Sequence, residues 1–329
     1  MAALYDVAAL GNAIVDVIAQ ASDDFLADEG LAKGGMTLID DDQAALLYSR
    51  MAPGIETSGG SAGNTIAGIA SFGGRGVFIG KVAKDTLGEI YAHDMDAIGA
   101  RFSGGRLEGG PATGRCLVNV TPDGQRTMCT YLGAANLLSP EDIDPAIIEA
   151  AQVTYLEGYL FDPPEARRAF AKAAGLARAN GRMIALSLSD GFVVDRHRAA
   201  LQGFIESEVD ILFANEAEIT ALFETADFDT AARAARGLVK IGALTRGAKG
   251  SVIVEGGDVH EIAAAPVQKV VDTTGAGDQY AAGFLHGLAR GGSMDHCGRL
   301  GALAAAEVIR HFGPRPQVSL LDLAMTAGL

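Results

Sequence analysis

The stretch that decides the fold is Asp272-Thr273-Thr274-Gly275-Ala276-Gly277-Asp278, a glycine turn that leads into an amphipathic helical pattern. Apolar residues recur on one face of that pattern, at Ala281, Phe284, Leu285 and Leu288. The two glycines let backbone amides converge, and the helix N-terminus adds a partial positive charge. The segment can therefore hold a negatively charged phosphoryl group with the Asp278 carboxylate beside it.

A carboxylate at this position can accept the proton of an attacking hydroxyl. The amides of Gly275, Ala276 and Gly277 can meanwhile stabilise charge on the transferred group, and these are the two demands of phosphoryl transfer to an alcohol. The alternative is that Asp278 only caps the helix, because Asp is favoured near helix starts. The segment alone does not separate the two interpretations.

The composition predicts one large globular α/β domain spanning residues 1–329, with 49% hydrophobic and 20% charged residues. A formal net charge of −15 repels nucleic acid and anionic membranes, so an anionic ligand needs a local positive site. There is no apolar run of roughly 18 residues and no basic start followed by an apolar run. Three cysteines without CxxC spacing argue against disulfides and zinc, so we expect a cytoplasmic protein.

Short runs rich in Val and Ile alternate with longer helical patterns, which is typical of βαβ units around a mostly parallel sheet. Core strands are expected at residues 7–10, 77–82, 153–157, 183–188, 211–214 and 243–245. Helices are expected at residues 43–50, 62–72, 87–98, 164–180, 217–223, 230–240, 278–290 and 297–311. Asp229 and Asn180-Gly181 are predicted helix caps. The polar run 191–198 is interpreted as a solvated, charged loop without an assigned role.

One region departs from this alternation. Two β-rich runs, 115–120 and 126–131, are joined by Pro122-Asp123-Gly124, which is typical of a hairpin. Together with residues 14–20 and 36–39 they predict a small β lid, built from about 14–56 and 104–132.

Two common nucleotide fingerprints are absent from the sequence. Gly80-Lys81 is followed by Val82 without the preceding glycine of a P-loop, and Tyr280 stands where a dinucleotide loop needs its third glycine. A P-loop fold and a Rossmann dehydrogenase are therefore disfavoured.

The chain resembles the ribokinase-like (PfkB) family of sugar and nucleoside kinases over nearly its whole length. The segment 272–278 followed by Ala281-Ala282-Gly283-Phe284 is similar to the C-terminal signature of that family. Four further segments match family elements in the expected order: Asn12 with Asp16, Gly59-Gly60-Ser61-Ala62-Gly63-Asn64, Asn215-Glu216-Ala217-Glu218 and Thr245-Arg246-Gly247-Ala248-Lys249-Gly250. The resemblance implies a three-layer α/β/α sandwich with a β lid.

The resemblance also implies an ATP-dependent kinase whose nucleotide site lies in about residues 185–329. Residues implied in nucleotide binding are Arg126, Asn215, Thr245, Arg246, Gly247, Gly250 and Thr274. Arg126 resembles the arginine that reaches from the lid toward the phosphates, and Arg115 on the paired run is its rival. Asn215 and Glu218 suit a Mg²⁺ ion held partly through water, because Mg²⁺ keeps most of its waters. The alternative is that Asn215 caps a helix with Glu218 in its first turn.

The N-terminal segments provide the expected acceptor site. Gly59 and Gly60 let the backbone approach a ligand, Asn64 offers a donor and an acceptor to vicinal hydroxyls, and Asp16 can bind hydroxyls bidentately. The alternative is a tight loop with a solvated lid charge. Asn12 and Ser61 complete the implied polar contacts, and Glu157 is expected either to contact ribose or to organise Mg²⁺.

The serine after the paired glycines is more similar to adenosine kinases than to ribokinase, which carries lysine there. An apolar slot for a base could be supplied by Met36, Leu38, Met128, Tyr159 and Phe161, which could equally be lid packing. We therefore expect ATP-dependent phosphorylation of the 5′-hydroxyl of adenosine to AMP, as in purine salvage. A PfkB sugar kinase acting on ribose or fructose is the alternative, followed by a catalytically silent nucleotide or sugar sensor. The sequence leaves open a monovalent cation near Asp272 and a monomer or homodimer.

Overall fold

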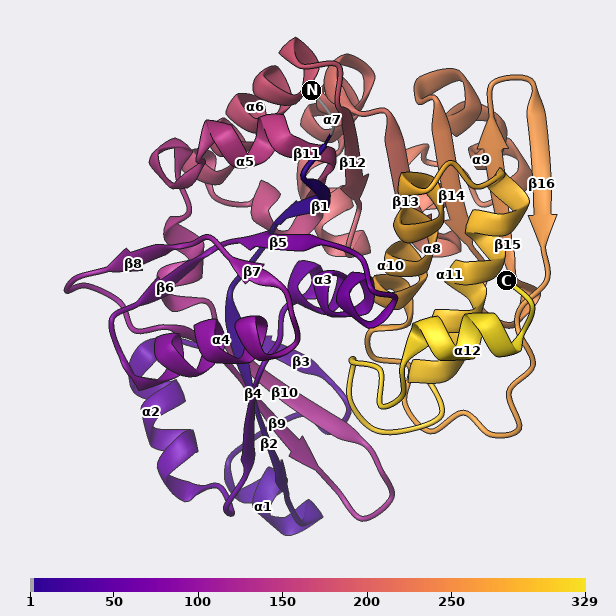
Figure 1. Cartoon of the computed structure of the whole chain (residues 1–329). Helices are drawn as coiled ribbons and strands as arrows, with labels where there is room; N and C mark the ends of the chain where they lie inside the picture. Colours follow the sequence, from indigo (N-terminus) through magenta and orange to yellow (C-terminus); the bar gives the residue numbers. More distant parts are fainter. Residues whose placement is uncertain (1–2) are drawn as a thin grey trace.

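The computed structural model, which describes residues 3–329, contains a nine-stranded sheet with helices on both faces and a five-stranded sheet at one end (Figure 1). The strand order of the large sheet is β16-β15-β14-β13-β12-β11-β1-β5-β7. Its strands are β1 Tyr5–Leu10, β5 Gly76–Ile79, β7 Arg101–Phe102, β11 Ala151–Glu157, β12 Met183–Ser187, β13 Ile211–Asn215, β14 Ile241–Thr245, β15 Ser251–Glu255 and β16 Asp258–Ile262. In this order, all neighbouring strands from β14 through β13, β12, β11, β1 and β5 to β7 pair in parallel, whereas β15 is antiparallel to both β14 and β16. The predicted mostly parallel α/β sheet is therefore confirmed.

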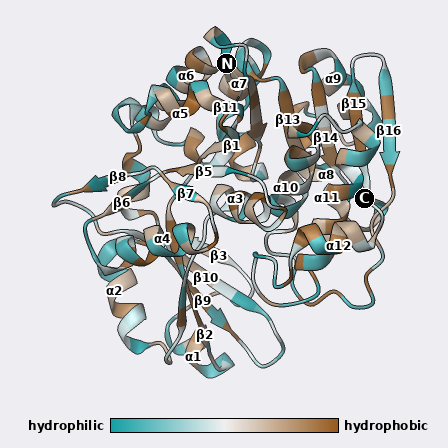
Figure 2. Cartoon of the chain, in the orientation of Figure 1, coloured by the Kyte–Doolittle hydropathy of each residue, from teal (hydrophilic) through white to brown (hydrophobic). Residues whose placement is uncertain are grey.

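Alternate residues of the strands feed two separate cores. Ala8 and Leu10 of β1 face one helical layer, while Val7 and Ala9 face the other. The first layer holds α5 Pro145–Ala150, α6 Pro164–Ala179, α7 Gly191–Glu208, α8 Glu216–Leu222 and α9 Phe228–Leu238. The second holds α3 Ser61–Ser71, α4 Thr86–Ala97, α10 Ala276–Ala289 and α11 Met294–Val308. The central strands are hydrophobic in Figure 2 and the edge strand β16 is hydrophilic, which discourages pairing with another chain.

The small sheet forms the lid. Its order is β3-β10-β9-β2-β4, with β2 Ile14–Gln20, β3 Met36–Leu38, β4 Ile55–Ser58, β9 Gly114–Val120 and β10 Arg126–Tyr131. One lid face packs Val17, Leu117 and Cys129 against Leu47 of α2 Asp41–Arg50. The other face carries Ile14, Cys116 and Val118. Residues 11–13 join β1 to β2, so the lid follows directly from the centre of the large sheet.

The remaining elements are short. They are α1 Asp23–Asp28, α12 Leu320–Thr326, the paired strands β6 Lys81–Ala83 and β8 Gly105–Leu107, and the 3₁₀ turns Gly133–Leu137, Pro140–Asp142, Gly158–Phe161 and Gly247–Lys249. Strand β8 pairs with β6, outside the five-stranded lid sheet.

Several sequence predictions are corrected by the structure. The hairpin at 122–124 is confirmed, but the single strand expected at 77–82 is wrong, because the chain changes sheet at Gly80 between β5 and β6. The run 191–198 is the first half of helix α7, not a loop. Asp227, rather than Asp229, caps α9 by accepting a hydrogen bond from the Thr230 amide.

None of the helices between residues 3 and 329 is long and apolar enough to cross a bilayer. The three cysteines of the chain are all buried free thiols. The structure therefore uses cysteine as a small core residue.

Candidate active site

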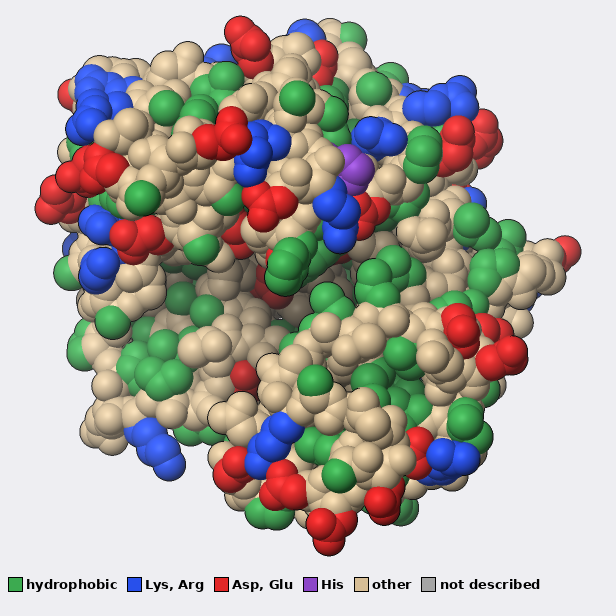
Figure 3. Space-filling view, turned by 180° about the vertical axis from the view of Figure 1, so that it is seen from behind, with side chains coloured by type: hydrophobic (Ala, Val, Ile, Leu, Met, Phe, Trp, Pro, Cys, Tyr) green, Lys and Arg blue, Asp and Glu red, His purple; other side chains and the backbone are tan. Residues whose placement is uncertain are grey.

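A cavity of about 570 Å³ lies between the lid and the carboxyl ends of the large sheet's strands. Figure 3 shows this side of the molecule hollowed across its middle, with apolar and acidic side chains inside the hollow. Crevices at the carboxyl ends of parallel strands are the usual ligand sites of open α/β sheets. The predicted site residues that line the cavity are Asn12, Asp16, Gly60, Ser61, Asn64, Arg126, Met128, Glu157, Tyr159, Asn215, Glu218, Thr245, Thr274, Gly275, Ala276, Gly277 and Asp278.

Of the residues predicted to bind the acceptor or the nucleotide through polar or backbone groups, four do not line the cavity, namely Gly59, Arg246, Gly247 and Gly250. Gly250, with φ +88°, turns against β16, because a Cβ there would collide with the Ile262 carbonyl. Its glycine is thus explained by packing of the turn, and Thr245 is the residue of this segment that reaches the cavity.

Asp278 lies in the first turn of α10, whose N-cap is Gly275 with φ +78°. One oxygen of the Asp278 carboxylate accepts from Ser61 Oγ at 2.6 Å and the other from Asn64 Nδ2 at 3.1 Å. Both donors belong to α3. The Asp278 side chain is therefore held by another helix rather than capping its own, and residues 275–278 line the cavity.

The site concentrates buried carboxyl groups. Burial raises the pKa of Asp278 to about 6 against the opposing hydrogen bonds from Ser61 and Asn64. Burial likewise raises the pKa of Asp16 to about 6, and those of Glu157 and Glu218 to about 7. A base with a pKa somewhat below neutrality is mostly ionised at pH 7 and can still hold a proton transiently.

Glu157 lies at the end of β11, and both of its carboxylate oxygens accept hydrogen bonds from within the protein. One carboxylate oxygen accepts from the Asn12 amide at 3.2 Å and Asn12 Nδ2 at 2.8 Å, and the other accepts from the Ala62 amide at 2.8 Å. It therefore joins the β1–β2 connection, where the lid begins, to the N-terminus of α3.

Asp16, on the lid strand β2, is placed against the glycine loop. A Cβ on Gly59 would collide with the Asp16 carboxylate, and Gly60 has φ +81° with its α-carbon against the Asn12 carbonyl. Within residues 3–329 the Asp16 carboxylate makes no side-chain hydrogen bond. Its oxygens are thus free to accept from ligand hydroxyls.

Arg126 crosses from the lid to the main domain. Its Nη1 lies 3.1 Å from Asp272 Oδ2, and its side chain is 9% exposed. Nε and Nη2 are buried and have no hydrogen-bond partner among residues 3–329, so both nitrogens could donate to a phosphate oxygen. Arg115, the rival, pairs instead with Asp41 on the outer side of the lid.

Asn215 and Glu218 form a capping box at the start of α8. The Asn215 side chain accepts from the Glu218 amide at 2.9 Å, and the Glu218 carboxylate accepts from the Asn215 amide at 3.0 Å and from Nδ2 at 2.6 Å. The capping alternative thus describes their geometry. Both also line the cavity and supply hard oxygen atoms, so a water-mediated Mg²⁺ role stays a prediction.

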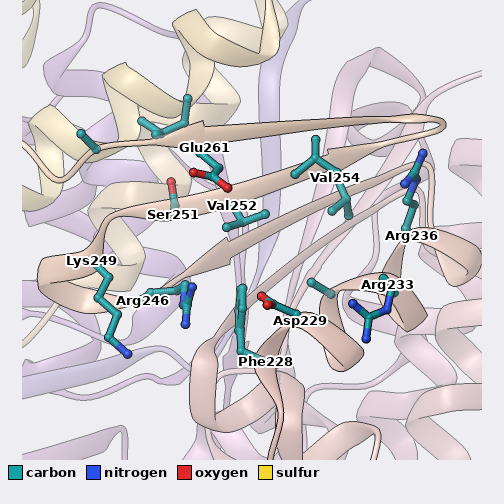
Figure 4. A pocket seen from close by; sticks show the side chains of 14 residues that line it. Phe228, Asp229, Arg233, Arg236, Arg246, Lys249, Ser251, Val252, Val254 and Glu261 are labelled. Atoms are coloured by element: carbon teal, nitrogen blue, oxygen red, sulfur yellow. The ribbon is translucent and has the colours of Figure 1, made fainter.

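Arg246 points away from this cavity. Its guanidinium lies 3.9 Å from the Phe228 ring centroid in a separate pocket beside α9 and β15 (Figure 4). The guanidinium also binds the Glu216 carboxylate. Successive residues at a strand end face opposite sides, so Thr245 and Arg246 cannot both face the cleft. A side-chain role for Arg246 at the nucleotide is therefore not supported by its position.

The structure adds residues that the sequence analysis missed. Phe192, Val193 and Arg196 of α7 line the cavity, as do Ser189 and Asp190 before it. Asp162 binds Arg196 and His197, which explains part of the charged run. The signal was available, because Asp190 follows a strand and precedes an apolar periodic segment in the manner of a helix cap.

The model of the pfkB family carbohydrate kinases matches residues 52–319. The chain belongs to the pfkB family, and it is a kinase.

Three similar proteins place the chain within the pfkB family. The adenosine kinase of Saccharomyces cerevisiae is 29% identical over 93% of this chain and 95% of its own length. The crystal structure of adenosine kinase from Sinorhizobium meliloti has 51% identity and a TM-score of 0.91, covering 98% of this chain and 99% of that one. A probable sugar kinase from Rhizobium etli CFN 42 has 46% identity and a TM-score of 0.92, covering 99% of both chains.

The raised pKa of Asp278 predicts a pH-dependent stability difference for Asp278→Asn. The native aspartate keeps its proton up to about pH 6 and an unfolded one up to about pH 4, so the wild type loses stability as the pH rises through this window. The neutral amide does not titrate. The free energy of unfolding of the variant relative to wild type should therefore rise between pH 4 and pH 8, by on the order of 3 kcal/mol.

Urea denaturation at pH 4.5 and pH 8 measures this difference. Asp96→Asn, an exposed aspartate on α4, is the control and should show no such change. If the free energy of unfolding of Asp278→Asn relative to wild type were the same at both pH values, folding would not raise the pKa of the Asp278 carboxyl group.

Proposed function

We propose that this kinase transfers the γ-phosphoryl group of ATP to the 5′-hydroxyl of adenosine, giving AMP and ADP. The observation that carries the proposal is the combination of a polar pocket floor with an apolar lid. Polar atoms suited to ribose hydroxyls are presented by Asn12, Asp16, Gly60, Ser61 and Asn64. Above them lie Ile14, Met36, Leu38, Val118, Met128 and Leu132.

The apolar lid favours an acceptor that carries a base. Met36 is 49% and Leu38 55% exposed, and both line the cavity. Exposed apolar side chains at a pocket mouth gain free energy when a flat aromatic group covers them. A free sugar has no such group. Phe161, which was also considered for the slot, is buried in the α6 core and does not line the cavity.

The residues of the cleft divide the reaction between them. Asp278 accepts the proton of the 5′-hydroxyl. At the same time the 5′-oxygen forms the new bond to the γ-phosphorus, and the bond from that phosphorus to the departing ADP breaks. The amides of Gly275 and Gly277 face the charge on the transferred group. The Ala276 amide between them donates to the Thr273 carbonyl at 3.2 Å, so it would have to exchange this partner to join them. The unpartnered nitrogens of Arg126 bind a phosphate oxygen.

Mg²⁺ would be held by Glu218 and Asn215 through water, and it supplies charge neutralisation for the phosphates. The oxygen donors present fit this ion, which needs few protein ligands when phosphates complete its shell. A monovalent cation near Asp272 would compete with Arg126, Thr274 and Gly313, which already bind that carboxylate. We propose a reducing compartment from the three free thiols.

A sugar kinase is the second candidate. It is favoured by the 46% identity to the probable sugar kinase of Rhizobium etli and by the family description. Its acceptor would use the same polar floor and leave the apolar lid surfaces uncovered.

An acceptor screen separates the two candidates. ADP release should be fastest with adenosine among adenosine, inosine, guanosine, ribose and fructose. Burial of the apolar lid by a purine base separates the nucleosides from the free sugars, and inosine and guanosine test which purine is accepted. If a free sugar turned over fastest and adenosine gave no product, the nucleoside proposal would be lost and the kinase assignment would stand.

Asp278→Asn should lower kcat by at least about 100-fold, since general-base catalysis contributes about 10²–10⁴ and the amide cannot accept the proton. ATP binding by calorimetry should stay within about threefold of wild type, because the volume is unchanged. Asp96→Asn serves as the control. A near-normal kcat in Asp278→Asn would refute the base assignment.

Glu218→Gln tests the Mg²⁺ site. Glutamine at this position preserves the capping box, so the fold should hold while the carboxylate charge is lost. The Mg²⁺ concentration for half-maximal rate should rise about tenfold or more. Glu216→Gln, in the same helical turn but bound to Arg246, should leave the Mg²⁺ requirement unchanged. An equal Mg²⁺ requirement in both variants would remove Glu218 from the site.

A further inference from the structure

The segment Gly313-Pro314-Arg315, which follows α11, is attached to the catalytic turn at three points. The Gly313 amide donates to Asp272 Oδ2 at 3.1 Å. Pro314 packs so closely on Gly275 that a Cβ there would lie 2.6 Å from it. Gln279, fully buried on α10, donates from Nε2 both to the Pro314 carbonyl at 2.9 Å and to the Asn64 carbonyl at 3.0 Å. The segment is thus fixed relative to both α10 and α3.

The Arg315 guanidinium of this segment lies on the oxygen side of the Asn64 amide, whereas Asp278 lies on its nitrogen side. Arg315 Nε donates to Asn64 Oδ1 at 3.4 Å, and Nη2 points to the Met95 sulfur at 3.8 Å. Within residues 3–329 no carboxylate lies within ion-pair distance of Arg315. Asp16, Asp94 and Tyr91 favour its charge at longer range, against the burial that lowers its pKa.

Asn64 therefore stands between an acceptor and a donor. The ionised Asp278 carboxylate can only accept a hydrogen bond, and the Arg315 guanidinium can only donate one. An amide between them satisfies both neighbours in a single orientation, with Nδ2 toward Asp278 and Oδ1 toward Arg315. The opposite orientation places oxygen against carboxylate and NH₂ against guanidinium, which repel.

We propose that Arg315 is a positioning residue, which holds the Asn64 amide so that its nitrogen faces Asp278. The inference rests on the proposed role of Asp278 as base, and it holds whichever alcohol is the acceptor. Without Arg315 the amide can rotate, and the ionised base then loses one of its two hydrogen bonds. The protonated form gains relative to the ionised form, so less base is available near neutral pH.

Other groups also act on Asp278, and a test must separate them from this effect. Those that face it are Ser61 and Asn64 from α3, Asp16 from β2, Tyr155 and Glu157 from β11, Tyr159 from the following 3₁₀ turn, and Glu218 from α8. Removing Arg315 takes a positive charge from this acidic set as well as a donor from Asn64. A double-mutant cycle with Asn64 isolates the second effect.

The experiment compares wild type, Arg315→Met, Asn64→Ala and the double variant, using the acceptor that turns over fastest. Arg315→Met should lower kcat about tenfold at pH 7, leave the KM for ATP within about twofold, and move the acidic limb of the kcat profile to higher pH. In the Asn64→Ala background the same substitution should change kcat less than about twofold. Arg315→Lys, which keeps a donor, should restore most of the rate. Arg310→Met, which removes an exposed charge just after α11, is the control.

Two results would overturn the proposal: equal losses from Arg315→Met with and without Asn64, or no loss in either. If Arg315→Met does not fold, Arg315→Ala, which also removes the donor to Asn64, replaces it in the cycle. The pKa of Asp278, followed by ¹³C-carboxyl NMR without substrates and assigned with Asp278→Asn, should rise in Arg315→Met and not in Arg310→Met. This readout needs no turnover, so it stands even if the proposed acceptor is wrong.

Discussion

The Asp278 carboxylate accepts hydrogen bonds from Ser61 and Asn64, two residues more than 200 positions earlier in the chain, with separations of 217 and 214. This contact requires α3 and α10 to pack closely against each other. A Cβ on Gly68 of α3 would collide with Gln279 and Ala282 of α10, so glycine is needed there. The site is assembled by the packing of one helix from each half of the chain, which fixes the base before any ligand arrives.

The cleft is unusual in placing acidic groups where a polyanion is expected to bind. Asp16, Glu157, Glu218 and Asp278 all have pKa values raised by burial. The proposed function gives each a task that suits a carboxylate: hydroxyl contact for Asp16, metal hydration for Glu218 and proton acceptance for Asp278, while Glu157 attaches the lid connection to α3. Under the proposed function the phosphates are bound by backbone amides, by the two nitrogens of Arg126 without a partner among residues 3–329, and by Mg²⁺. A negatively charged protein thereby confines its attraction for phosphate to one small region.

Sequence analysis predicted the sheet and most of the cleft because the relevant residues lie at strand ends, where motifs are contiguous. Thr245, Asn215 and Glu157 reach the cavity for this reason. Arg246, predicted at the nucleotide, lines a separate pocket instead of the cleft, because it directly follows Thr245 at the strand end and faces another side. Arg315 was missed because its partner Asn64 is 251 positions away, and no periodicity links a residue after the last core helix to the first turn of α3. Contacts of this kind depend on tertiary packing, which a local pattern does not encode.

The central claim is that Asp278 and the 275–277 amides form the reacting centre for a 5′-hydroxyl. The most direct measurement is a crystal structure with adenosine and a non-hydrolysable ATP analogue. We expect the 5′-oxygen within hydrogen-bond distance of the Asp278 carboxylate and the terminal phosphate at the N-terminus of α10. The adenine ring should lie against Met36, Leu38 and Met128. A 5′-oxygen bound elsewhere, with Asp278 still held by Ser61 and Asn64 and contacting no ligand, would contradict it.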